Sequence, residues 1–90
     1  METVESIAAG TRVLLAAVAE TDLEKTYYSV FLEDGFVAIG VGIEGGRPHA
    51  KIKEKTLLAA AISVREQVIE MAREKIQKAE QVANLLKEIR

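Results

Sequence analysis

The chain has 90 residues, no cysteine and a net charge of −2, with 12 Lys and Arg against 14 Asp and Glu. Hydrophobic residues make up 49% and charged residues 29%, which is typical of one globular domain and argues against a disordered chain. Neither a disulfide framework nor a thiolate zinc site can form without cysteine, and the net charge gives no global attraction to nucleic acid or anionic lipid.

The expected location is the cytoplasm. No apolar run approaches the ~20 residues that a membrane-spanning helix needs. The segment before the first apolar run carries Glu2 and Glu5, where a secretory signal needs cations. We therefore expect no membrane partner.

Residues 4–20 are predicted to form the first helix. Thr3 is a suitable N-cap, and apolar side chains recur near the 3.6-residue period of a helix. These side chains are Val4, Ile7, Ala8, Leu14, Leu15 and Val18.

From residue 26 the apolar period changes to two, which predicts strands over residues 26–33 and 36–43. Asp34-Gly35 between them is the dipeptide most typical of two-residue hairpins, because both positions accept positive φ. This turn would place Val30 opposite Ile39.

A third strand is predicted over residues 47–53, after a tight turn at Gly45-Gly46. That turn would pair Glu44 with Arg47, two opposite charges, and Gly42 with His49. Further along, it would pair Val41 with Ala50 and Ile39 with Ile52. Pro48 cannot donate a ladder hydrogen bond, so this strand is expected at the sheet edge.

Residues 56–90 contain neither Gly nor Pro and are predicted to form one long helix with Thr56 as its N-cap. The predicted fold is therefore α+β, in the order α-β-β-β-α, within a single domain over residues 1–90. A three-stranded antiparallel meander would carry both helices on its apolar face.

The stretch Gly40-Val41-Gly42-Ile43-Glu44-Gly45 matches the G-x-G-x-x-G pattern of a dinucleotide-binding loop. That motif works where the glycine turn leads into a helix whose N-terminus holds the pyrophosphate, within a βαβ unit. Here an extended segment follows, so we interpret the glycines as strand residues. We expect no cofactor.

The predicted register places the apolar residues of the strands on the helix-facing side of the sheet. The opposite side, called the outer face below, would combine aromatic rings, glycines and basic groups. We consider three interpretations of it: a solvated edge whose rings cover their own glycines, a binding face for a partner or an anion, and an oligomer interface. The candidate binding residues are Tyr27, Phe31, Gly40, Gly42, Arg47, His49, Lys51 and Lys53.

The element order resembles that of double-stranded-RNA-binding domains, and this resemblance implies nucleic acid as an alternative partner. Stacking rings beside basic groups would suit such a role. The sequence departs from that family at the start of the last helix, where a basic cluster is expected but "KIKEKT" is interrupted by Glu54 and followed by "LLAAAI". The resemblance therefore carries no residue over.

The long helix would measure about 50 Å, more than the ~30 Å diameter of a compact domain of this size. Either the helix breaks and folds back, or its distal part overshoots the domain with an apolar stripe in water. A partner helix from a second copy would cover such a stripe. The predicted interface is Ile69, Ala72, Ile76, Ala79, Ala83 and Leu86, flanked by Val82 and Ile89.

These features predict a small, non-enzymatic binding module that forms a homodimer or a higher oligomer. Its outer face would contact a partner or an anionic ligand, with RNA or DNA as the alternative. An enzyme using His49, the only histidine, comes third, because no second catalytic group stands at a readable spacing from it.

Overall fold

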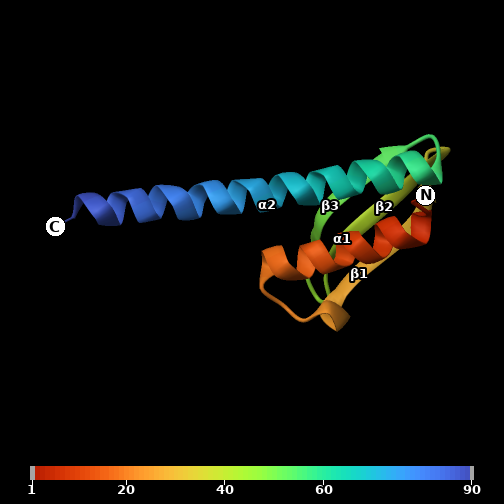
Figure 1. The fold of residues 1–90 in the computed structure, drawn as a ribbon. Coiled ribbons are helices and arrows are strands. Elements are labelled where there is room, and N and C mark those ends of the chain that lie inside the picture. Colours follow the sequence, from red (N-terminus) through yellow and green to blue (C-terminus); the bar gives the residue numbers. More distant parts are fainter. Residues whose placement is uncertain (1, 90) are drawn as a thin grey trace.

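A computed structural model describes residues 2–89 and shows two helices on one face of a three-stranded sheet (Figure 1). The sheet is antiparallel with strand order β1-β2-β3. The predicted α+β class and α-β-β-β-α order are therefore confirmed. The elements are α1 (Val4–Ala19), a 3₁₀ turn η1 (Leu23–Lys25), β1 (Thr26–Glu33), β2 (Phe36–Ile43), β3 (Pro48–Glu54) and α2 (Leu57–Glu88).

Both helices start at the residues that the sequence predicts. The Thr3 hydroxyl accepts a hydrogen bond from the Ser6 amide at 3.1 Å, and the Thr3 amide donates to the Ser6 hydroxyl at 3.0 Å. The Thr56 hydroxyl likewise accepts from the Ala59 amide. Glu20 was predicted to be helical but caps α1 in the left-handed conformation, with φ 54°, so α1 ends one residue earlier. The long helix was predicted over residues 56–90, but α2 ends at Glu88 with Ile89 as its C-cap, and residue 90 lies outside the described residues.

The first hairpin has the predicted register. Asp34 and Gly35 form the turn with φ of 54° and 79°, as expected for a two-residue hairpin, and Val30 pairs with Ile39. Glu33 pairs with Phe36 at the turn.

The second turn differs from the prediction by one residue. The Gly46 amide donates to the Ile43 carbonyl, and Gly45 takes the positive φ of 82°, so the turn is centred on Glu44-Gly45 rather than Gly45-Gly46. The predicted pair of Glu44 with Arg47 does not form within the ladder, because β3 begins at Pro48.

A bulge then restores the predicted register further along β3. Gly42 pairs with Pro48, whereas Val41 pairs with Ala50, so the pairing of Gly42 with His49 was wrong and His49 is the extra residue. From Ala50 onward the pairs are as predicted, including Ile39 with Ile52. β3 spans residues 48–54 instead of 47–53.

The core lies between the sheet and the two helices. Its completely buried members include Ile39 and Val41 of β2 and Leu15 of α1. Thr11 is also buried and donates its hydroxyl hydrogen to the Ile7 carbonyl, which satisfies the polar group inside α1. The other buried members are Ile7 of α1 and Ala60, Ala61, Val64 and Val68 of α2.

At the end of β1 next to the first turn, the apolar side chains lie on the predicted face but are not buried. Val30 and Leu32 lie on the same side as the core residues of β2, yet they are 49% and 81% exposed. Tyr28, two residues earlier, does pack against the core. The two helices do not cover the whole sheet, and the end of β1 next to the Asp34-Gly35 turn is left uncovered.

The two helices run in the same direction (Figure 1). Ion pairs join them near both ends of α1. Glu2 pairs with Arg65 at the start. At the other end the Lys75 ammonium lies 2.9 Å from a Glu20 carboxylate oxygen and donates to the Val18 carbonyl at 2.7 Å. The hydrogen bond and the charge of Lys75 lower the pKa of Glu20.

Beyond Lys75, α2 continues as an unbroken helix past the end of α1 and past the sheet (Figure 1). The molecule measures 57 × 28 × 23 Å, and its radius of gyration of 15.5 Å exceeds the roughly 12 Å of a compact chain of this length. Of the two alternatives for the long helix, the structure has the overshooting one.

Candidate functional site

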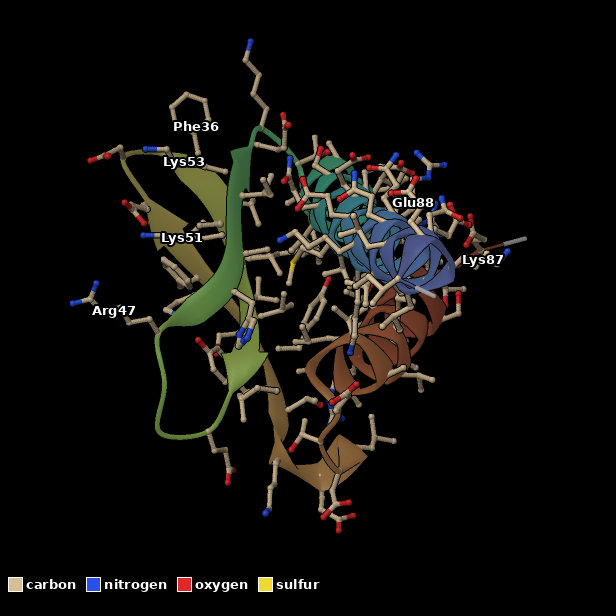
Figure 2. All side chains as sticks on the ribbon, turned by 90° about the vertical axis from the view of Figure 1, so that its left-hand side faces the viewer. Phe36, Arg47, Lys51, Lys53, Lys87 and Glu88 are labelled. Carbon is tan, nitrogen blue, oxygen red and sulfur yellow. The ribbon has the colours of Figure 1, made fainter. Side chains whose placement is uncertain are left out.

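The outer face of the sheet carries most of the predicted binding residues. Phe36, Lys51, Lys53 and Arg47 project from the side of the sheet opposite the helices (Figure 2). On the same face, Ala38, Gly40 and Gly42 of β2 are buried although no helix covers them. Side chains of the outer face itself must therefore cover the central strand.

Tyr27 and Phe31 provide part of this cover. A Cβ atom added to Gly42 would lie 2.8–2.9 Å from three atoms of the Tyr27 ring, so the ring lies directly on the bare backbone. At Gly40 the nearest atom, Cε1 of Phe31, would be 3.9 Å away, an ordinary van der Waals distance. Only Gly42 is thus required for the position of its ring.

The two lysines of β3 are each held by a ring and a carboxylate of the first hairpin. Lys51 lies 5.2 Å from the centroid of Phe31 and 2.7 Å from a Glu33 oxygen. Lys53 lies 5.8 Å from the centroid of Phe36 and 3.3 Å from an Asp34 oxygen. Cation–π contacts and exposed ion pairs are individually weak, but here they neutralise much of the predicted basic surface.

Arg47 lies at the opposite end of the outer face, beside the second turn, and His49 stands at the bulge two residues later. Both are exposed, and Pro48 lies between them. Within residues 2–89 neither side chain has a hydrogen bond or an ion pair, and the bulge removes His49 from its expected place opposite Gly42. The predicted set is therefore divided into a self-paired lysine group and a separate Arg47–His49 end.

The G-x-G-x-x-G stretch lies in β2 and in the turn that follows it. Gly40 and Gly42 lie inside β2, and the residues after the second turn form β3 rather than a helix. No helix N-terminus is available at these glycines to hold a pyrophosphate. At Gly42 the absence of a side chain admits the Tyr27 ring, whereas Gly40 has room for a Cβ atom.

The described residues enclose no pocket, and no three of their His, Asp and Glu side chains group as metal ligands would. One polar group in the core is unusual. The Tyr28 hydroxyl is buried without a hydrogen-bond partner among residues 2–89, and burial raises the pKa of this phenol.

The distal part of α2 carries a set of exposed apolar side chains. Ile76, Val82 and Leu86 are 58%, 55% and 64% exposed, and Leu85 and Ile89 are exposed as well. Of the predicted interface, Ile69 and Ala72 are already half-buried within the protomer, so they do not belong to the wet stripe. We define the distal stripe as Ile76, Ala79, Val82, Ala83, Leu86 and Ile89.

The distal stripe continues the buried face of α2. Eighteen residues make five complete turns, so side chains that far apart on a straight helix point in the same direction. Val64 and Val68 are completely buried against α1 and the sheet, and eighteen residues later come Val82 and Leu86. In Figure 2, which looks along α2 from its C-terminal end, Lys87 and Glu88 point away from the sheet.

The periodicity of the sequence identified this stripe but not its orientation toward the domain. The spacing of eighteen residues between Val64 and Val82, which is five helical turns, could have shown that the stripe faces the same side of α2 as the core residues. Two further features were not predicted from the sequence: the contacts of Lys75 with the end of α1, and the exposure of Leu32. The first is a contact between residues 55 positions apart, and no local pattern signals it.

Comparison with protein-family models, with curated proteins and with solved structures finds no match. The surfaces described above therefore carry the functional argument by themselves. Within residues 2–89, no helix combines the length and the apolar content that crossing a bilayer would require.

Proposed function

We propose that this protein is a self-associating, non-enzymatic binding module, in which the distal stripe joins copies and the outer face contacts a further partner or an anionic ligand. The observation that carries the first half is the exposure of Ile76, Val82 and Leu86 on a helix that has left its own domain. Burying each such side chain stabilises a complex by roughly 1.5–3 kcal/mol.

A second copy is the simplest partner for this stripe. It brings the same apolar surface, and no additional molecule has to be assumed. Small residues at Ala79 and Ala83 allow two helix backbones to approach closely, while Val82 and Leu86 supply apolar area. Charged and amide side chains fill the opposite side of the segment, where they remain in water.

Light scattering coupled to gel filtration tests self-association directly. The wild-type protein should be larger than a 9.8 kDa monomer at micromolar concentration. Ile76→Glu with Leu86→Glu should release monomers, because each carboxylate would enter an apolar interface.

The matched control is Gln77→Glu with Asn84→Glu, which adds the same two charges on the opposite side of α2. This control should keep the oligomer. A wild-type protein that stays monomeric at high micromolar concentration would contradict the proposal.

For the outer face, the half-exposed rings of Phe31 and Phe36 support contact with an apolar partner. An anion would have to displace Glu33 and Asp34 from the lysines, or bind at the Arg47 end. The nucleic-acid alternative loses support for the same reason, because Lys51 and Lys53 already have carboxylate partners. Binding to the phosphates of a nucleic acid would weaken steeply as salt rises, whereas contact with an apolar partner would not, so salt dependence distinguishes these two kinds of partner.

Catalysis by His49 gains no support from the structure. The residue is exposed at the bulge near the start of β3, and within residues 2–89 no hydrogen bond or ion pair joins its side chain to another group. A general base needs a substrate position within hydrogen-bond reach and a group that orients it.

A further inference from the structure

The direction of the distal stripe decides how two copies can pair. We propose that the protein forms an antiparallel dimer through the distal segments of α2, with the two domains at opposite ends of a rod. This inference rests on the proposed self-association and adds its geometry. Its starting point is that the stripe and the domain lie on the same side of α2.

That shared side follows from the eighteen-residue relationship. Ala61, Val64 and Val68 contact the domain, and Ala79, Val82 and Leu86 stand five turns further along in the same directions. Figure 1 shows α2 running on without a break or a sharp bend between these two sets. A helix that covers the distal stripe must therefore lie in line with α1, beyond its C-terminal end.

A parallel pair is excluded by the bulk of the domain. Packed helices have axes 8–10 Å apart. In a parallel pair both domains would stand at the same end, each projecting from its own α2 toward the other copy. Each molecule is 23–28 Å across, of which a helix takes about 10 Å, so the two domains would occupy the same space.

An antiparallel pair avoids this collision. The tip of the second α2 fills the space beyond the end of α1 and stops near Lys75, while its own domain lies past the tip of the first α2. The helical segments overlap over residues 76–88, about 20 Å of helix. The two-fold axis then passes close to Val82 and Ala83, which face their own counterparts.

The pairing continues an interface that already exists within each copy. Along α2, Val64 and Val68 are covered by the same molecule, and Val82 and Leu86 would be covered by the other. Because α1 ends at Ala19, it cannot extend over the distal stripe itself. The result is a rod that displays two outer faces far apart, suited to connecting two partner molecules.

Spin-label distances test this geometry, and the absence of cysteine makes single-site labelling clean. Gln67→Cys places a label on the exposed side of α2, away from both interfaces. In the antiparallel dimer the two labelled positions would be about 45–50 Å apart along the helix axis. In a parallel dimer they would be about 10–25 Å apart.

The expected result is a dimer by light scattering with the long distance. This distance should disappear when labelled protein also carries Ile76→Glu and Leu86→Glu. A dimer with the short distance would overturn the antiparallel arrangement while leaving self-association intact. A monomer would refute both, so failure of this inference is distinguishable from failure of the proposed function.

Discussion

Val64 and Val82 point in the same direction from α2, yet Val64 is completely buried and Val82 is 55% exposed. The difference arises because α1 ends after the first part of α2, and the apolar pattern of α2 does not end with it. The same residue type at equivalent helical positions is thus part of the core at one site and exposed at the other.

This pair provides the first prediction. Val64→Ala should lower the free energy of unfolding by about 1–3 kcal/mol, because it removes buried volume from the core. Val82→Ala should leave the thermal stability of the dilute protomer almost unchanged but weaken association. Thermal unfolding at low concentration and light scattering at high concentration measure the two effects. If the two substitutions changed stability and association equally, the assignment of Val64 to the core and of Val82 to an association surface would be refuted.

The glycines of β2 provide the second prediction. Gly40→Ala should stabilise the protein by up to about 0.5–1 kcal/mol, because alanine loses less conformational freedom than glycine and its Cβ has room. Gly42→Ala should lack this gain, because its Cβ displaces the Tyr27 ring. Chemical denaturation measures both.

The control for the glycine pair is the same comparison in a Tyr27→Ser background. Without the ring, Gly42→Ala should resemble Gly40→Ala. If the two glycine variants differ equally in both backgrounds, the contact of Tyr27 with Gly42 is not the cause.

The third prediction concerns the buried hydroxyl of Tyr28. Since this group has no hydrogen-bond partner among the described residues, Tyr28→Phe should leave stability unchanged or raise it by up to about 1 kcal/mol. Denaturant unfolding measures the change. A loss of more than 1 kcal/mol would mean that the hydroxyl is satisfied in solution, for example by a bound water.

The fourth prediction concerns pH. Lys75 lowers the pKa of Glu20 in the folded state, so the pair contributes stability above the carboxyl pKa of the unfolded chain. That contribution is lost as the pH falls through the lower, folded pKa. Lys75→Met should raise the pKa of Glu20, measured by NMR titration of the carboxyl carbon. An unchanged pKa in this variant would show that the pair does not persist in solution.

The sequence alone determined the features that depend on neighbouring residues. Thr3 and Thr56 mark helix starts because their hydroxyls satisfy amides three residues later. Asp34-Gly35 determines the first hairpin, since two adjacent positions must accept positive φ. At the second turn two neighbouring glycines offered alternatives, and the choice of Gly45, with the bulge at His49, could not be derived from that pattern.

Only the tertiary structure decided which apolar and charged groups remain available. Leu32 and Ile39 follow the same alternation, but the helices cover Ile39 and leave Leu32 in water. Lys51 looks like a free cation in the sequence and is held by Glu33, a neighbour only across the sheet. Val82 repeats Val64, and its exposure depends on where α1 stops. Burial depends on the combined extent of packed elements, which no local pattern encodes.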